Sequence, residues 1–556
     1  MNIINPNTGR DFVTDAISFK AKFEKETMAV EQTCKEVLKE IIEINKNTQF
    51  GKGHNFSCIK DEEQYKSNVP LSVYSDFQSY VERMASGEEN LLTSEAVVFF
   101  GLSSGTTGNQ KLIPITERAR KIRAMHMSLL TNGVLFEKFP QTQQFNKGLM
   151  MMSLSAVRKS KSGIPMGAGS SGNMRALQWL ASITGTSPVE IFEEPNQQTA
   201  NYIHLLFALK ERDLLFLNAP LAPTLLALLH QLEHDWPSLI EDIRTGKIDR
   251  SIELTDQLRE NLEHRIEPDE ERAEELTKLF KEGFEQIAPK IWPKLLYVQC
   301  IAGGSFSVYI QKLQFYVGNT PIFTPAYNST EALIGSCLWP GKQYYVLTPR
   351  TAYFEFIPTD NNAGIEALPI YKLELGNTYE IVLTNYCGLY RYRLGDVVKV
   401  VDFYHQCPVI EFQYRHGQLL NIAGEKSSEH AVFNALLETS MKLDCLLIDF
   451  TTTVNYDMHP GNYDFFVEIE TTNNSYLTSF REILDESMKE ANPIYKIMRD
   501  TGKINPINVK IVKNGTFEEF SKALRKKIGS KGPVKIPRLI SDNTLICFLE
   551  ESEIIK

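Results

Sequence analysis

The pattern of apolar and polar positions opens with helical periodicity. Between residues 15 and 50 apolar side chains recur every three or four positions among charged ones, which predicts long amphipathic helices. Residues 251–287 repeat the pattern with a denser load of charges. We interpret those charges as the solvated faces of helices, because charge runs of this kind seldom form binding surfaces.

Short apolar runs between these helical regions predict strands. From residue 343 to 402 the runs become closely spaced and are broken by Pro, Gly and Asn, which predicts a β-rich segment. The polar, glycine-containing stretch 415–429 follows, and an alternation of strands and helices restarts after it. We therefore expect an α/β protein with a domain boundary in this stretch. The separate strand candidates are 96–100, 149–154, 214–217 and 296–301.

One uncharged stretch, residues 214–232, is long enough to resemble a membrane span. Asn218, Pro220 and Pro223 divide it into a short strand-like run and an apolar helix, so we expect it to be part of the core. The N-terminal residues have neither a basic start nor an apolar run, which argues against a secretory signal. We expect no membrane association.

Length and composition narrow the class of protein. A chain of 556 residues exceeds one compact core and predicts at least two domains, and 42% apolar residues exclude a disordered chain. The net charge of −10 argues against a nucleic-acid-binding protein. The eight cysteines are scattered without a CxxC pair, which is typical of reduced thiols in a cytoplasmic protein.

A hydroxyl-rich loop carries the first sign of chemistry. In VVFFGLSSGTTGNQK an apolar strand leads into serines, threonines and glycines at 103–108, with Lys111 after them. Glycines let a backbone approach an anion, hydroxyls donate hydrogen bonds to phosphate oxygens, and a lysine supplies charge. The segment lacks the GK[ST] ending of a Walker A loop. It predicts either a phosphate-binding loop or an ordinary turn.

Three motifs in order and spacing resemble the nucleotide motifs of the Gretchen Hagen family of acyl acid amido synthetases, which belong to the adenylate-forming superfamily. They are SSGTTGNQK at 103–111, PAYNSTEALIG at 325–335 and YRYRLGDVV at 390–398. Further segments similar to the family extend the resemblance from about residue 90 to residue 540. Two features depart from the plant members: the first loop is one residue shorter, and AGEKSSE stands where they usually carry DSDKTDE. Both departures argue against assuming a plant hormone as the substrate.

The resemblance implies the architecture of the chain. A large N-terminal adenylate-forming domain, residues 1–420, would have β-sheets flanked by helices and a β-rich, barrel-like part. A hinge at 421–430 would lead to a small, mobile α+β domain at 431–556. The small domain would rotate about the segment near Lys426 between two half-reactions.

The resemblance also implies the reaction, that of an ATP-dependent ligase which forms C–N bonds. The enzyme would adenylate a carboxylic acid with release of pyrophosphate and then transfer the acyl group to an amino acid amine with release of AMP. We expect ATP and Mg²⁺ as cofactors, no nucleic-acid partner, and a monomer or weak dimer. An acyl-CoA ligase and a catalytically silent nucleotide-binding protein on the same scaffold stay open as alternatives.

Roles for individual residues follow from the family motifs. Glu331 would help to hold Mg²⁺, Thr330 would face the α-phosphate, and Lys535 would stabilise the charge that develops during adenylation. No general base is needed, because the attacking carboxylate is already ionised at neutral pH. The implied catalytic residues are Lys535, Glu331 and Thr330, with Glu331 as the metal ligand.

The remaining implied contacts are with the nucleotide. Asp396, expected in a loop after Gly395, would accept hydrogen bonds from the ribose hydroxyls. Arg391 and Arg393 alternate along an expected strand, and the sequence leaves open whether they serve the site or only solvate a sheet edge. The flexible stretch 159–175 is a candidate for the acyl-acid pocket. The implied nucleotide-binding residues are Ser103, Ser104, Thr106, Thr107, Lys111, Gly303, Gly304, Tyr327, Ser329, Asp396 and Lys426.

Overall fold

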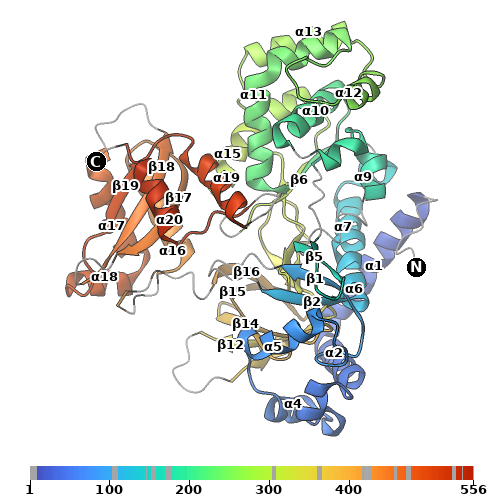
Figure 1. Ribbon diagram of the computed structural model, residues 1–556, viewed down its shortest axis with the longest axis vertical. Helices are drawn as coiled ribbons and strands as arrows, with labels where there is room; N and C mark the ends of the chain where they lie inside the picture. The colour runs from blue at the N-terminus through green and yellow to red at the C-terminus, as the bar shows by residue number, and fades with distance from the viewer. Residues whose placement is uncertain are drawn as a thin grey trace. The chain divides into compact units, whose positions relative to one another are not determined.

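The computed structural model of the chain divides into two compact units (Figure 1). The first unit holds most of the chain up to Glu411, and the second runs from Phe412 to the C-terminus together with Gly395–Val398. The structure describes residues 9–102, 111–145, 147–151, 158–168, 178–194, 196–303, 308–359, 366–415, 420, 422–423, 425, 427–455, 460–470, 477–528, 534–540 and 542–554.

The helices of the first unit confirm both predicted helical regions. In α2, the spacing of Val37, Leu38 and Ile41 buries one face and leaves charged residues on the other, as the periodicity predicted. These helices are α1 (Gly9–Met28), α2 (Val30–Asn45), α3 (Gln49–Gly53), α4 (Glu62–Asn68), α5 (Tyr74–Ala85), α6 (Glu117–Met125), α7 (Thr131–Lys138), α9 (Gln178–Thr184), α10 (Gln197–Lys210), α11 (Ala222–Thr245), α12 (Asp256–Glu263), α13 (Glu270–Lys281), α14 (Ile287–Ile291) and α15 (Val308–Val317).

Two four-stranded sheets precede the β-rich segment. One has the order β2-β1-β5-β4, with β1 and β2 antiparallel, and the other is parallel with the order β3-β6-β7-β8. They confirm the strand candidates 96–100, 214–217 and 296–301, with shifted ends. Candidate 149–154 contains the short strand β3, and residues 152–154 lie outside the described residues. The strands are β1 (Val97–Leu102), β2 (Leu112–Thr116), β3 (Leu149–Met150), β4 (Arg158–Lys159), β5 (Pro165–Ala168), β6 (Phe216–Leu221), β7 (Tyr297–Ile301) and β8 (Ile322–Phe323).

The predicted β-rich segment forms most of an eight-stranded sheet with the order β13-β12-β14-β15-β16-β11-β10-β9. Asp396 lies within the continuous strand β15, so the prediction that it lies in a loop is wrong. Gly395 takes a φ of 83° inside that strand, which a glycine accommodates without steric cost. The strands are β9 (Ala326–Asn328), β10 (Leu333–Ser336), β11 (Tyr345–Leu347), β12 (Tyr353–Pro358), β13 (Leu368–Pro369), β14 (Thr378–Thr384), β15 (Tyr392–Tyr404) and β16 (Cys407–Arg415).

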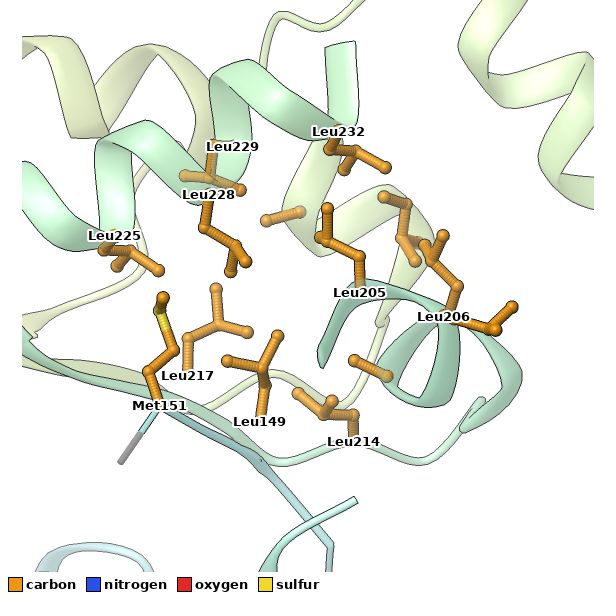
Figure 2. Close-up of a cluster of buried hydrophobic side chains, with 14 of the residues drawn as sticks. Leu149, Met151, Leu205, Leu206, Leu214, Leu217, Leu225, Leu228, Leu229 and Leu232 are labelled. Carbon is orange, nitrogen blue, oxygen red and sulfur yellow. The ribbon is translucent and has the colours of Figure 1, made fainter. Parts of the chain in front are cut away.

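A leucine-rich core lies between the parallel sheet and the helices α10 and α11. Figure 2 shows Leu149 and Leu217 from the sheet facing Leu225 and Leu228 of α11, and all four are at most 1% exposed. The side chains of Leu149, Leu217 and Leu225 carry no polar atoms, so their close packing excludes water without leaving a side-chain hydrogen-bonding group unsatisfied. The expectation that 214–232 is core is confirmed, and no helix among the described residues is long and apolar enough to cross a membrane.

The second unit has a three-stranded sheet, β17-β18-β19, in which β17 and β18 are antiparallel and β18 and β19 are parallel. Its hydrophobic core includes Phe466 from β18 and Phe520 and Leu549 from two of the helices. The expected α+β character of this part is confirmed. Its elements are α16 (Glu429–Lys442), β17 (Leu446–Asn455), β18 (Asn462–Glu470), α17 (Leu477–Ala491), α18 (Pro493–Asp500), β19 (Asn508–Val512), α19 (Thr516–Ile528) and α20 (Asn543–Glu551).

Arg391 immediately precedes β15 and resolves one question that the sequence left open. Its side chain is buried and forms an ion pair with Glu355 of β12, with Nε to Oε2 and Nη2 to Oε1 both at 3.0 Å. Arg393 pairs with Glu380 of β14. Both arginines therefore stabilise the sheet, and because Arg391 has a φ of 45° and lies outside β15, the two do not alternate along one strand as expected.

We expect Arg391→Met to lower the free energy of unfolding by about 3–5 kcal/mol, because it leaves the Glu355 carboxylate buried without its cation. Chemical denaturation followed by circular dichroism measures the loss. Arg83→Met is the matched control, since Arg83 and its partner Glu88 are exposed, and it is expected to change stability little. An equal effect of both substitutions would contradict the importance of the buried pair.

Candidate active site

The structure describes both flanks of the hydroxyl-rich loop, up to Leu102 and again from Lys111. Leu102 of β1 lies opposite Leu112 of β2, so the two ends of the loop are held together by an antiparallel pair of strands. Lys111 is described and half-buried. The other predicted residues of the loop lie outside the described residues, as do two predicted nucleotide contacts elsewhere; they are Ser103, Ser104, Thr106, Thr107, Gly304 and Lys426.

The second motif forms a hairpin of β9 and β10 with a tight turn at its end. The Ser329 hydroxyl donates to the carbonyl of Ala332 and accepts from its N–H, each at 3.1 Å, and the Ser329 N–H donates to the same carbonyl at 2.9 Å. The turn places Thr330 and Glu331 at its tip. Ser329 therefore has a structural task in the turn, and its contact with a nucleotide stays a prediction.

Two side chains that the sequence analysis missed fix the backbone of this turn. Arg123 donates from Nη2 to the carbonyl of Thr330, and Asn385 donates from Nδ2 to the carbonyl of Glu331, both at 2.9 Å. Arg123 and Asn385 are both buried, and burial lowers the pKa of the Arg123 guanidinium, an effect that the nearby Glu331 carboxylate opposes. The turn is thus held from two sides at its two predicted catalytic residues.

Gly101 in β1 makes the approach of Thr330 possible. A Cβ atom at residue 101 would lie 2.6 Å from Cγ2 of Thr330 and 3.3 Å from Cδ1 of Ile115. The first distance is far below a van der Waals contact. Glycine is therefore required where the strand that leads into the hydroxyl-rich loop meets the second motif.

Glu331 is the predicted metal ligand, and it is only 8% exposed. Among the described residues there is no group of three or more His, Cys, Asp or Glu side chains that could hold a metal ion. A single carboxylate still fits Mg²⁺, which commonly binds one or two carboxylates together with substrate phosphates and water. In the described part of the chain no cation forms an ion pair with Glu331, which leaves its charge for such a ligand.

The predicted nucleotide contacts Gly303 and Tyr327 both lie beside Tyr345 of β11. A Cβ atom at Gly303 would lie 3.1 Å from the Tyr345 hydroxyl, and the rings of Tyr327 and Tyr345 have centroids 5.8 Å apart. Thr324 fixes the end of β7 nearby: its hydroxyl donates to the carbonyl of Cys300 and accepts from the N–H of Ala302. The structure thus brings two of the predicted residues together around a tyrosine that the sequence analysis missed.

The predicted ribose ligand Asp396 belongs to the second unit with Arg415. Asp396 is buried, and its Oδ1 accepts a hydrogen bond of 2.5 Å from Nε of Arg415. Arg415 was not among the predicted residues, because a lone arginine at the end of a strand carries no sequence signal. The pair gives Asp396 a fixed orientation.

Lys535 is half-buried and lies in a segment that is bound to β17. The Thr451 hydroxyl donates to the carbonyl of Pro537, and the Thr452 N–H donates to the carbonyl of Arg538. Arg538 is itself buried and donates through Nη1 to Asp449. The lysine near the C-terminus is therefore part of the packed unit, where the sequence alone is typical of a solvated tail.

Four charged groups act on the Lys535 ammonium, and all belong to the second unit. Burial lowers its pKa below the ordinary value for lysine, and Arg538 and Arg415 lower it further. Glu429 gives the largest opposing effect, followed by Asp396. Glu429 is the first residue of α16, whose N-cap is Ser428.

The candidate acyl-acid stretch is described only in part. Strands β4 and β5 form an antiparallel pair with Lys159 opposite Pro165, and residues 169–175 lie outside the described residues. Strand β5 also pairs in parallel with β1, with Ala168 opposite Leu102 at the start of the hydroxyl-rich loop. The role of the stretch as a substrate pocket stays a prediction.

Comparison with known proteins shows the family. The GH3 family N-terminal domain matches residues 19–322, the central domain 345–415 and the C-terminal domain 430–544. The chain belongs to the GH3 family. GH3 is the Gretchen Hagen family, so the resemblance inferred from the three motifs is confirmed along nearly the whole chain.

Individual relatives agree with this assignment. The 4-substituted benzoates-glutamate ligase GH3.12 of Arabidopsis thaliana is 28% identical and is covered over 98% of its length by 97% of this chain. The solved GH3.15 acyl acid amido synthetase in complex with 2,4-DB has a TM-score of 0.84 and 27% identity, with 99% of this chain and 97% of that chain covered. A 2-hydroxyisobutyryl-CoA ligase in the postadenylation state has a TM-score of 0.52 at 11% identity, covers 93% of this chain and 90% of its own, and shares the fold alone.

These matches confirm the adenylate-forming α/β fold and the prediction of an acyl acid amido synthetase, a ligase that forms C–N bonds.

We expect Gly101→Ala to reduce acid-dependent exchange between pyrophosphate and ATP by at least about tenfold. The added methyl group would displace Thr330, and overpacking of this kind costs about 1–3 kcal/mol. Gly53→Ala is the control, because nothing lies within 4 Å of the position of its Cβ atom. Unchanged exchange in a folded Gly101→Ala protein would contradict the close approach of β1 to the second motif.

Proposed function

We propose that this protein joins a small carboxylic acid to the amine of an amino acid in two steps, through an acyl-adenylate. The observation that supports this most is the grouping of residues far apart in sequence. Asp396 and Lys535 act on each other electrostatically, as do Glu429 and Lys535. An adenylating site needs a lysine that stabilises phosphate charge and a carboxylate that binds ribose. Lys535 and Asp396 are suited to these two roles.

In the first step the substrate carboxylate attacks the α-phosphorus of ATP, and the bond to the pyrophosphate oxygen breaks. Negative charge grows on the phosphate oxygens, and Lys535 is suited to stabilise it as an ammonium. Lys111 is suited to hold the departing pyrophosphate, with Thr330 beside the α-phosphate. Mg²⁺ bound at Glu331 would neutralise phosphate charge. No residue has to remove a proton, because the acid is already ionised.

In the second step the amine of an amino acid attacks the carbonyl carbon of the adenylate. The bond from this carbon to the phosphate oxygen breaks, AMP leaves, and the nitrogen loses a proton as the amide forms. We propose that the C-terminal domain at 431–556 turns about the hinge at 421–430 between the steps. A cytoplasmic location and a monomer or weak dimer remain predictions.

The acyl acid belongs to a broad class. The relatives named above are a ligase of 4-substituted benzoates and glutamate and a synthetase solved with 2,4-DB. We propose an aryl or aryl-alkyl carboxylic acid, to be sought by a pyrophosphate-exchange screen over aryl, indolyl, jasmonate-like and fatty acids. With the best acid, amino acids and coenzyme A are then supplied separately. A thioester with no amide would favour the acyl-CoA ligase alternative, and no exchange with any acid despite ATP binding would favour a silent scaffold.

We expect Lys535→Ala to slow adenylation by about 10²- to 10³-fold, the usual effect of removing a group that stabilises a transition-state charge. Acid-dependent pyrophosphate exchange measures this step alone. Lys526→Ala is the control, because Lys526 is an exposed lysine of the same unit, and it should leave exchange unchanged. A Lys535→Ala enzyme as fast as the parent would rule out this role for Lys535.

The pH dependence of exchange should have an alkaline limb set by Lys535. Its folded pKa is lowered from the ordinary value, so activity that needs the ammonium is lost as pH rises through this lowered value. Glu429→Gln removes the largest effect that raises the pKa, so the limb should move to lower pH.

The control for this shift is Glu438→Gln on the same helix. Glu438 pairs with Lys442 at 2.7 Å and is not among the groups that act on Lys535. It should leave the alkaline limb unmoved. A limb that stays in place in Glu429→Gln, or that moves equally in both variants, would contradict the electrostatic coupling of Glu429 with Lys535.

A further inference from the structure

Tyr74, the first residue of α5, contacts the root of the hydroxyl-rich loop although it belongs to none of the three motifs. Its hydroxyl donates to the carbonyl of Leu112 at 3.1 Å and accepts from the N–H of the same residue at 2.9 Å. Leu112 begins β2, which is the edge strand of its sheet. One hydroxyl thus satisfies both main-chain groups that an edge residue would otherwise turn toward solvent.

The same tyrosine also contacts the residue just before Leu112. The Lys111 ammonium lies 5.5 Å from the centroid of the Tyr74 ring and 5.9 Å from that of Tyr392, and it donates to the Tyr392 hydroxyl at 3.3 Å. Distances of this size permit an attraction between a cation and the face of a ring. No carboxylate in the described part of the chain forms an ion pair with Lys111.

The two tyrosines are fixed independently of Lys111. Asp76 accepts a hydrogen bond from the N–H of Val73 and so closes the first turn of α5 around Tyr74. Ser72 forms a bridge with Tyr392: its N–H donates to the carbonyl of Arg391 and its carbonyl accepts from the N–H of Arg393. Tyr74 and Tyr392 are therefore tied to each other through the backbone before α5.

We propose that Tyr74 and Tyr392 are positioning residues for Lys111 that set the affinity of the protein for the β- and γ-phosphates of ATP. Two rings and a hydroxyl hold the ammonium without neutralising it, whereas a carboxylate partner would compete with the phosphates for its charge. The hydroxyl of Tyr74 fixes the main chain from which the lysine extends. This inference rests on the proposed function, since it takes Lys111 as a ligand of the departing pyrophosphate.

The test compares MgATP with AMP, because AMP lacks the phosphates that Lys111 would contact. Titration calorimetry with each nucleotide needs no acyl acid. In Tyr74→Phe and in Tyr392→Phe, which keep the ring and remove the hydroxyl, we expect MgATP to bind about five- to tenfold more weakly, roughly the loss of one hydrogen bond to a charged or fixed group. AMP should bind as it does to the parent.

Tyr80→Phe is the matched control, since Tyr80 lies on the same helix and contacts Phe50 and Arg83. Its binding of both nucleotides should be unchanged. Equal weakening of MgATP and AMP would mean that the hydroxyls serve only the fold, and unchanged MgATP affinity in Tyr74→Phe would overturn the inference while leaving the proposed function intact. A parent protein that binds neither nucleotide would instead remove the proposed function, and the inference with it.

Discussion

The buried guanidinium of Arg391 is the constraint on which the geometry of the third motif depends. Besides its pair with Glu355, it donates to the carbonyl of Val69 at 2.9 Å, while its main-chain N–H donates to the Thr384 hydroxyl. Its φ of 45° is costly for a residue with a side chain, so the surrounding contacts must compensate for it. They do so where β15 starts, and the strand then carries Tyr392 and Asp396 in a fixed register.

The sequence predicted most of the regular structure because periodicity reports burial directly. The helices between residues 15 and 50, the core stretch 214–232 and the β-rich segment all follow from the spacing of apolar residues. Periodicity failed at Asp396, since a glycine in a strand and a glycine in a loop look alike in sequence. It also failed at Arg391, because one left-handed residue before a strand changes which side chains share a face.

The predicted site was recovered from motifs, and the motifs say little about what supports them. Arg123, Asn385, Thr324 and Tyr345 fix or border predicted residues, yet each is a single side chain from an element remote in sequence. No local pattern distinguishes such residues from ordinary core positions. A motif can also combine two tasks, as in Ser329, whose hydroxyl closes the turn that presents its neighbours. Only the folded structure shows which residues of a motif are free to contact a ligand and which hold the motif in shape.

The two lysines with proposed roles show that a positive charge can be prepared in two physical ways. Lys111 is bordered by the rings of two tyrosines, which attract a cation yet cannot neutralise it. The charges of Arg415, Arg538 and two carboxylates act on Lys535, and its burial and the arginines lower its pKa. The first arrangement leaves the lysine without a carboxylate partner in the described part of the chain, so it can pair with a phosphate that must be held. The second weakens the hold on a proton, so the strength of Lys535 as a cation depends on Glu429 and on pH.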